Sequence, residues 1–424
     1  MSAPTSAPSR LARRLGTVDA VIIGLGSMIG AGVFASFAPA AHAAGNGLLV
    51  GLVIAAFVAY CNATSSAQLA ALYPQSGGTY IYGRERLGAF WGFLAGWGFV
   101  VGKLASCAAM AMTFGHYAAP SFTRPTAMVA VASLTAVNYF GVQKTAKLTK
   151  VIVALVFAAL VLVVAAVWLG GSADFGRLWP LTGATPYGVL QSAGFLFFAF
   201  AGYARLATLG EEVIDPARTI PRAIPLALGI ALVVYAAVGV SALAGAGAPV
   251  IAASPAPLAA AVAAGSWAPL APVVRVGAAV AALGALLSLI VGVSRTIFAM
   301  SSHRDLPAFL AAVHARYRVP HRAELVVGTL VVLAVAVADL WTAIGFSSFA
   351  VLVYYAIANA AAFTLAPKQR RWPRAFAALG LLGCLALAWT LPLASILAGA
   401  VLLAVGALVY GLRRLGAKET LDEP

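Results

Sequence analysis

Gly24-Leu25-Gly26-Ser27-Met28-Ile29-Gly30-Ala31-Gly32 places four glycines inside an apolar span of the sequence. Each glycine weakens a helix by roughly 1 kcal/mol relative to alanine. In a membrane, every backbone group released from a helix must find another partner. Interrupted membrane helices are therefore typical of secondary transporters, in which the half-helix ends hold a small charged solute. The simpler alternative is that these glycines only let neighbouring helices pack closely.

The composition indicates a membrane protein. Of the 424 residues, 62% are hydrophobic and only 9% are charged, which is too few charges for the surface of a soluble domain. The formal net charge is +15, and the basic residues gather in short clusters between apolar spans. The clusters are Arg10/Arg13/Arg14, Arg84/Arg86, Lys144/Lys147/Lys150, Arg218/Arg222, Arg316/Arg318/Arg322, Lys368/Arg370/Arg371/Arg374 and Arg413/Arg414. They follow alternate spans, as cytoplasmic loops do, so the charge indicates topology and no nucleic-acid partner is predicted.

The cysteines and histidines give no sign of a metal site or a catalytic centre. Cys61, Cys107 and Cys384 all lie within apolar spans, in an odd number and without ligand spacing. The five histidines, at positions 42, 116, 303, 314 and 321, lie at span ends and in loops. The sequence therefore predicts no enzyme, no metal and no cofactor.

Twelve apolar spans have about the length needed to cross a bilayer. They lie at roughly 18–41, 47–72, 89–117, 125–141, 149–169, 188–209, 223–246, 271–300, 324–341, 343–366, 374–390 and 392–412. An even number of spans places the tails, 1–17 and 413–424, on the same side, which the basic clusters make cytoplasmic. The fold class is thus an all-α, multi-pass protein, and the alanine-rich composition favours the plasma membrane of a bacterium.

Two of the spans are irregular. The first contains the glycines of 24–32, and the sixth contains Phe197-Phe198-Ala199-Phe200-Ala201-Gly202-Tyr203, followed shortly by an arginine. Breaks in spans one and six imply two halves of five helices, 18–169 and 188–366, which enter the membrane from opposite sides. The last two spans, within 374–412, then lie outside this inverted repeat.

Several motifs, in order along the chain, carry a family resemblance. They are Gly26-Ser27-Met28-Ile29-Gly30-Ala31-Gly32-Val33-Phe34, Tyr73-Pro74-Gln75-Ser76-Gly77-Gly78-Thr79-Tyr80, Glu211-Glu212-Val213-Ile214-Asp215-Pro216, Thr219-Ile220-Pro221-Arg222-Ala223-Ile224, Ser294-Arg295 and Asp305-Leu306-Pro307. With them the chain resembles the amino acid–polyamine–organocation (APC) superfamily over nearly its whole length. The resemblance implies a five-plus-five inverted repeat with discontinuous helices 1 and 6, and transport of amino acids by alternating access.

The opened backbone suits the two charges of an amino acid. The N-terminus of a half-helix presents free N–H groups to a carboxylate, and the C-terminal end of the preceding half presents carbonyl oxygens to an ammonium. By resemblance, the carboxylate side of the site is formed by Ser27, Met28, Ile29, Gly30, Ala31 and Gly32. The ammonium side is formed by the backbone carbonyls of Ala199, Phe200, Ala201 and Gly202.

Phe198 aligns with a position where the family commonly has an aromatic gate above the substrate. The alternative is ordinary packing, because aromatic side chains also fill cores. Resemblance further places the third span along the substrate cavity, near Ser106 and Cys107.

Lys103 lies about fourteen residues into the third span, hence on the order of 20 Å deep. A lysine at this depth is a candidate functional group. It is interpreted as a proton carrier, as a fixed cation in place of a sodium ion, or as a structural lysine bonded to backbone carbonyls. Some proton-coupled relatives have a lysine inside the fifth helix, but here that span has none, and Lys150 lies near its cytoplasmic end. Ser288 and Ser294 could instead help a sodium site, although protons are favoured.

Arg205 lies in the cytoplasmic half of the sixth span. It is predicted either to pair with Glu211, Glu212 or Asp19 as an inner gate, or to reach the lipid headgroups. Asp19 itself is interpreted as a first-turn acid, with Thr17 as the helix cap.

The sequence therefore predicts a secondary active transporter for amino acids, small or neutral ones, because no acidic side chain lies near the expected site. Its partners are the substrate, a coupling ion (a proton, or else sodium) and the lipid bilayer. The alternatives are an exchanger, a sodium-coupled symporter, or a transporter of another small amine or organic anion. A channel would need a continuous polar pore, and a sensor would need a soluble output domain. The preferred amino acid, the direction of flux and the oligomeric state stay open.

Overall fold

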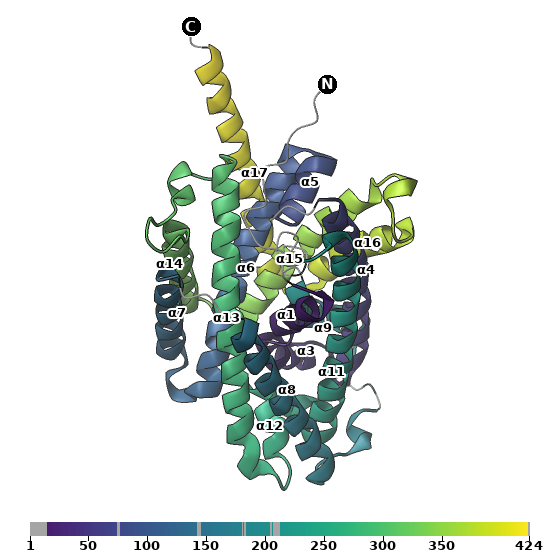
Figure 1. Cartoon of the computed structure of the whole chain (residues 1–424). Helices are drawn as coiled ribbons and strands as arrows, with labels where there is room; N and C mark the ends of the chain where they lie inside the picture. Colours follow the sequence, from purple (N-terminus) through teal and green to yellow (C-terminus); the bar gives the residue numbers. More distant parts are fainter. Residues whose placement is uncertain are drawn as a thin grey trace.

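The computed structural model describes residues 15–73, 77–141, 146–179, 181, 184–203, 206 and 213–422, with the side chains of 146–147 and 415–422 left undescribed. Within these ranges the regular elements are helices, and a single parallel bridge joins Leu15 to Val213. Figure 1 shows the helices gathered in one bundle, from one end of which α17 projects.

Each of the expected apolar spans coincides with a helical segment. The part of the chain up to residue 169 contains α1 (Thr17–Met28), α2 (Ala31–Ala35), α3 (Phe37–Ala44), η1 (Gly45–Gly47), α4 (Leu48–Leu72), α5 (Thr79–Leu87), α6 (Ala89–Ala118), η2 (Pro120–Phe122), α7 (Thr123–Tyr139) and α8 (Ala146–Leu169). The next part contains η3 (Phe175–Arg177), α9 (Pro186–Phe200), η4 (Ala201–Tyr203), α11 (Pro216–Ala253), α12 (Pro257–Ala263), η5 (Ala268–Leu270), α13 (Ala271–Ser302), η6 (Ala308–Ala311), α14 (His321–Val337) and α15 (Leu340–Phe363). The chain ends with η7 (Pro367–Gln369), α16 (Arg374–Thr390) and α17 (Leu393–Asp422).

Eight segments of the described chain are long and apolar enough to cross a membrane. The other expected spans are shorter. The helices α7, α14 and α16 have 17 residues each and α9 has 15, which corresponds to about 25 Å or less at 1.5 Å per residue. The hydrocarbon core is about 30 Å thick, so length alone identifies eight crossings.

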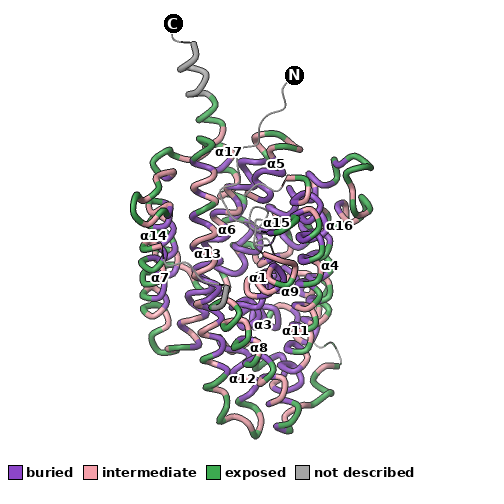
Figure 2. The backbone as a smooth tube through the Cα atoms, viewed as in Figure 1, coloured by how far each residue is buried: buried purple, intermediate pink, exposed green. Residues whose placement is uncertain are grey.

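The centre of the bundle is densely packed, and its rim is apolar and open. Figure 2 shows buried backbone around α1, α6, α9 and α15 and exposed backbone along α7, α14 and α17. The exposed side of α17 carries aliphatic residues at helical spacing, namely Leu393, Leu397, Val401, Val405, Leu408 and Leu412. A soluble protein does not expose such a stripe, whereas a membrane helix turns it toward lipid.

Local caps set where several helices begin. The α9 helix starts with Pro186 in its first turn, and the Thr185 side chain accepts a hydrogen bond from Gly188 N at 3.0 Å. The Asp339 carboxylate, just before α15, accepts the N–H groups of Trp341 and Thr342 at 2.9 and 3.0 Å. Partial burial of Asp339 would raise the pKa of its carboxyl, but these hydrogen bonds outweigh burial and hold the pKa below its usual value.

Candidate functional site

The first apolar span is interrupted at Ile29 and Gly30. The α1 helix ends at Met28, Gly30 has φ −102° and ψ −143°, and α2 begins at Ala31. Ser36, between α2 and α3, keeps helical dihedral angles, so the chain from Ala31 to Ala44 runs as a nearly continuous helix. Glycine is needed at the break for space, since a Cβ on Gly30 would lie 2.8 Å from the Cβ of Ala285 on α13.

The interruption is shorter than the sequence predicts. Gly24 and Gly26 lie within α1, as do Ser27 and Met28. A Cβ on Gly24 would lie 2.5 Å from Leu206, and one on Gly26 would lie 3.0 Å from Val153. For these two glycines the prediction of opened backbone is wrong and the alternative holds, because they make room for neighbouring side chains.

The sixth span changes its helical form at the expected place. The α9 helix ends at Phe200 and continues as the 3₁₀ turn η4 over Ala201, Gly202 and Tyr203. Ala199 and Phe200, which the sequence places in opened backbone, are still α-helical. Arg205, Glu211 and Glu212 lie outside the described residues, so the predicted inner gate stays a prediction.

The two irregular spans lie directly against each other. A Cβ on Gly32 would lie 2.8 Å from Ala199 Cα, and one on Gly202 would lie 2.6 Å from Met28 N and overlap the Ser27 carbonyl. Gly32 and Gly202 therefore bring the backbones of α2 and α9, and of α1 and η4, into contact that a side chain would prevent. The predicted carboxylate-side and ammonium-side residues thus share one place in the fold.

The interruption at Ile29 and Gly30 and the change from α9 to η4 after Phe200 are the two breaks. A tyrosine that was not predicted from the sequence joins them. The Tyr235 hydroxyl on α11 donates a hydrogen bond to Met28 O at 2.6 Å and lies 3.0 Å from Ala199 O. Its single proton can serve one carbonyl at a time, so the two oxygens face one shared donor. The available signal was a tyrosine in the middle of an apolar span, where a buried hydroxyl needs a partner. A second tyrosine, Tyr117 on α6, donates to Phe34 O on α2 at 2.9 Å.

No carboxylate side chain belongs to these breaks. The sequence has no acidic residue between Asp19 and Glu85, between Glu85 and Asp174, or between Asp174 and Glu211. Both breaks fall inside these acid-free stretches. Within the segments 28–32 and 199–202, the groups that could meet a charged solute are therefore backbone carbonyl oxygens and backbone N–H groups.

Phe198 differs from Phe197 and Phe200 in its ring contacts. Phe197 packs edge-on against Tyr355, with ring centroids 5.9 Å apart, and Phe200 packs on Tyr235 at 5.0 Å. Phe198 is buried as well, but it has no ring partner among the described residues. An aromatic side chain without such packing is compatible with a movable gate, which stays a prediction.

Lys103, Ser106 and Cys107 lie on one side of α6, as spacings of three and four residues require. Lys103 is 5% exposed, and its Nζ lies 6.0 Å from the centroid of the Phe99 ring. No ion pair or hydrogen bond joins its ammonium to another residue in the described part of the chain. The Ser106 hydroxyl lies 2.6 Å from that of Ser347 on α15.

The serines proposed for sodium differ in position. Ser288 is on α13, three residues after Ala285, so it shares the side of the helix that meets Gly30. Ser294 is buried on another side of the same helix. Each hydroxyl bonds to its own helix, Ser288 to Gly284 O at 2.9 Å and Ser294 to Val291 O at 3.0 Å.

The N-cap residue of α1 and the partner of Asp19 differ from those predicted. Gly16, and not Thr17, is the N-cap residue, and its N–H donates to Asp19 at 3.4 Å. The Asp19 carboxylate pairs with Lys150 Nζ on α8 at 3.1 Å. Lys150 thus has a partner at the start of α1, which ties the first and fifth expected spans together.

Known proteins resemble the chain over nearly its whole length. An uncharacterized transporter of Mycobacterium tuberculosis is 61% identical over 414 residues, which cover 97% of this chain and 94% of the relative. A branched-chain amino acid permease of Bacillus subtilis is 27% identical over 452 residues, covering 97% of this chain and 95% of the relative. A methylthioribose transporter of Bacillus subtilis is 26% identical over 451 residues, covering 95% and 93%.

The sequence pattern of one transporter family, described as amino acid permease, matches residues 15–414. This range contains both interrupted spans and ends at Arg414, near the end of the last apolar stretch. With its apolar helices and its transporter relatives, the chain belongs to the amino acid permease family and is a membrane transporter.

Proposed function

We propose that the protein carries small or neutral amino acids across the plasma membrane by alternating access. The observation that carries the proposal is the junction of the two breaks, where Tyr235 faces the carbonyls of both Met28 and Ala199. At this junction the chain offers backbone N–H groups and carbonyl oxygens side by side, without an acidic side chain. These are the partners that a carboxylate and an ammonium need when they are only a few ångströms apart.

The carboxylate would bind at the start of the helical run from Ala31, beside Gly30 and Gly32. The first N–H groups of a helix are free of helical partners and carry its positive dipole end. The ammonium would bind to carbonyl oxygens at the C-terminal ends of two helices. These are the end of α1 at Met28 and the end of α9 with the following turn, at Ala199 to Gly202. Ser27, Ile29 and Phe200 support these segments, while Phe198, Ser106 and Cys107 would border the substrate side chain.

A twelve-helix, five-plus-five repeat supports alternating access. Inversion would relate α4 to α11, α6 to α13 and α7 to α14, and the helices of each of these pairs touch one another. The same inversion would relate α6 to α13 and α15 to α8. The contact between α6 and α15 should then have a counterpart between α13 and α8, and both contacts are present. A two-fold axis through the breaks accounts for these paired contacts. In this arrangement both termini are cytoplasmic.

The expected substrate side chain is uncharged. Met28, Ile29, Ala31 and Cys107 are apolar and buried, and the charged side chain beside Cys107 is the cationic Lys103, so a cationic substrate group there would lack a partner. The names of the relatives point both ways, because one is called a branched-chain amino acid permease and another a cationic amino acid transporter, so the lining residues carry the expectation of an uncharged side chain. The relative called a methylthioribose transporter has an uncharged thioether substrate, and it makes a neutral organic solute the second candidate.

Coupling to protons is proposed through Lys103. Its amine is deep in α6 and has no carboxylate partner among the described residues, so its proton can be gained or lost without breaking an ion pair. The alternatives are a lysine that stays charged in place of sodium, and a sodium site that includes Ser288.

Uptake into proteoliposomes tests this function. We expect labelled L-leucine or L-alanine to enter saturably, to be displaced by unlabelled neutral amino acids, and to enter faster when the outside is more acidic, with or without sodium. Lysine, glutamate and methylthioribose should not compete. Flux that rises linearly with concentration and shows no competition would contradict a transporter of amino acids.

The contacts of the Tyr235 hydroxyl with Met28 O and Ala199 O, here called the clamp, give a second testable prediction. Changing Tyr235 to phenylalanine removes the hydroxyl shared by Met28 O and Ala199 O and leaves a buried carbonyl without a donor. Such a loss costs about 1–3 kcal/mol, so we expect substrate affinity to fall roughly tenfold, which corresponds to about 1.4 kcal/mol. Binding of the labelled amino acid to the purified protein measures the change.

Tyr354→Phe is the matched control. The Tyr354 hydroxyl is also buried, and it accepts the N–H of Thr79 on α5 at 3.0 Å, so its hydrogen bond is made to neither break. This variant should lose some thermal stability but keep its substrate affinity within about twofold. Equal affinities in Tyr235→Phe and the unmodified protein would exclude the clamp from substrate binding.

A further inference from the structure

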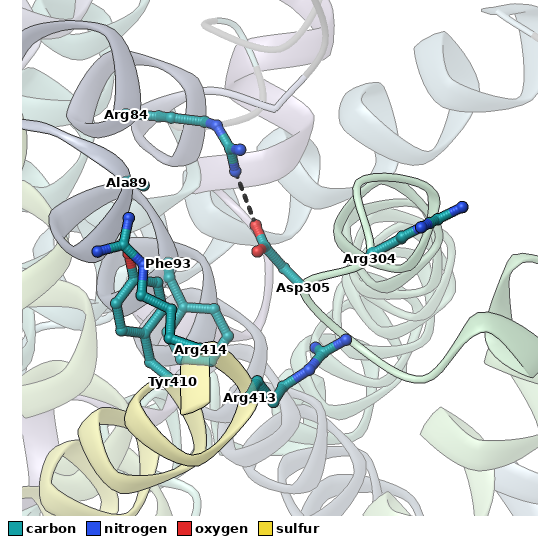
Figure 3. A pocket seen from close by; sticks show the side chains of 8 residues that line it. All are labelled: Arg84, Ala89, Phe93, Arg304, Asp305, Tyr410, Arg413 and Arg414. Atoms are coloured by element: carbon teal, nitrogen blue, oxygen red, sulfur yellow. Dashed lines mark hydrogen bonds and ion pairs between the residues drawn. The ribbon is translucent and has the colours of Figure 1, made fainter. Parts of the chain in front are cut away.

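A pocket of about 320 Å³ lies at the end of the bundle from which α17 projects, away from the two breaks. Four arginines line it: Arg84 from α5, Arg304 from the turn after α13, and Arg413 and Arg414 from α17. Its acidic lining residue is Asp305, so the lining has a formal charge of +3. Figure 3 shows that these side chains come from three separate parts of the chain.

Asp305 neutralises one side of the pocket only. Its carboxylate pairs with Arg84 at 3.0 Å and accepts the Tyr80 hydroxyl at 2.5 Å. Arg304 and Arg413 have no ion pair with another described residue, and Arg414 lies over the Tyr410 ring at 5.2 Å. In Figure 3 the Arg84 side chain reaches toward Asp305, whereas Arg304 extends away from the other labelled side chains. The pocket therefore holds more positive charge than the described residues balance.

The chemistry of the lining matches a phosphate group. A guanidinium offers paired N–H donors in a planar fork that fits phosphate oxygens. Several guanidinium groups at one place favour an anion that can accept several hydrogen bonds at once. Basic pockets between membrane helices at a membrane surface bind the headgroups of anionic lipids.

The surroundings indicate that the phosphate belongs to a lipid. Phe93 and Tyr410 form an aromatic wall of the pocket, with ring centroids 5.4 Å apart. Trp91, in the first turn of α6, is 45% exposed, and aromatic side chains of this kind gather at membrane interfaces. From the pocket, the exposed Leu412 and Leu408 continue along α17. A headgroup in the pocket would thus leave its acyl chains on an apolar surface.

We propose that this pocket binds the phosphate group of an anionic phospholipid and thereby holds α17 against α5 and the turn after α13. The Arg84–Asp305 pair already joins α5 to that turn, and the bound phosphate would add Arg413 and Arg414 of α17 to the same cluster. The lipid would be a structural ligand of the transporter, distinct from its substrate.

Thermal unfolding of the full-length protein in detergent tests the proposal, with dioleoylphosphatidylglycerol as the probe. We expect this lipid to raise the midpoint of unfolding saturably. The zwitterionic dioleoylphosphatidylcholine should have no such effect, nor should glycerol 3-phosphate or inorganic phosphate at the same concentrations. In R413Q/R414Q the half-maximal concentration of phosphatidylglycerol should rise at least tenfold.

R222Q/R316Q is the matched control, because it also removes two exposed arginines, one of which, Arg316, lies over a tyrosine ring. Its half-maximal concentration should change less than twofold. Equal responses of the two double variants would overturn the pocket as the binding place, and an equal response to phosphatidylcholine would overturn the requirement for an anion. Stabilisation by glycerol 3-phosphate alone would overturn the lipid as its source. If R413Q/R414Q fails to fold, R413Q alone should raise the half-maximal concentration about threefold, and an unchanged value would overturn the proposal.

Discussion

Lys103→Ala is expected to abolish the accumulation of substrate while leaving exchange of substrate across the membrane intact. A gradient of one pH unit supplies about 1.4 kcal/mol per proton, which corresponds to about tenfold accumulation. If the Lys103 amine carries the proton, alanine removes the link between the gradient and the substrate, and the accumulation ratio should fall to about one. Uptake into proteoliposomes under an imposed pH gradient, followed by counterflow without a gradient, measures both activities.

Two further substitutions at this position separate the possible roles of the amine. Lys103→Met removes the charge but fills most of the volume, so it should behave like Lys103→Ala if charge matters and like the unmodified protein if only packing matters. Lys103→Arg keeps a charge that is never lost in proteins. Arginine should therefore fail to support proton coupling, but it should succeed if the lysine acts as a fixed cation. Full accumulation in Lys103→Ala would remove the lysine from the mechanism.

The positions of the helices could be predicted from the sequence because hydropathy and length decide them. Each expected apolar span coincides with a helical segment, from α1 to α17. Eight segments meet the length of a crossing, while α7, α9, α14 and α16 do not, because they have only 15 to 17 residues and the apolar periphery of a span in the sequence does not show where the helix itself begins and ends. The symmetry of the two halves stays a proposal that the paired contacts support.

At the candidate site, the sequence located the break but not its extent. Gly24, Gly26 and Gly30 cannot be told apart from the sequence. Only Gly30 lies where the helix is interrupted, whereas Gly24 and Gly26 lie within α1 and face Leu206 and Val153. Which glycine opens a helix depends on what packs against it, and that information comes from distant parts of the chain. Tyr235 was missed for the same reason, since its hydroxyl acquires a role only when α11 lies beside both breaks.

The largest expected effect concerns the two charged ends of the substrate. At the proposed site the carboxylate would be bound by backbone N–H groups and the ammonium by backbone carbonyl oxygens, and hydrogen bonds to charged groups contribute about 1.5–3 kcal/mol each. Blocking one end of the amino acid leaves several buried backbone groups without a partner. Amidation of the carboxylate or acetylation of the amine should therefore weaken binding at least about 100-fold, which corresponds to about 2.8 kcal/mol. Moderate changes of an aliphatic side chain, such as leucine to valine, should change affinity by about tenfold at most.

Calorimetric titration of the purified protein with L-leucine, L-leucinamide and N-acetyl-L-leucine tests most directly whether the junction of the two interrupted helices recognises a zwitterion. We expect L-leucine to bind, and both blocked derivatives to bind at least about 100-fold more weakly. Equal affinity for L-leucine and either derivative would contradict recognition of the charged ends by the backbone at Gly30 and Gly202.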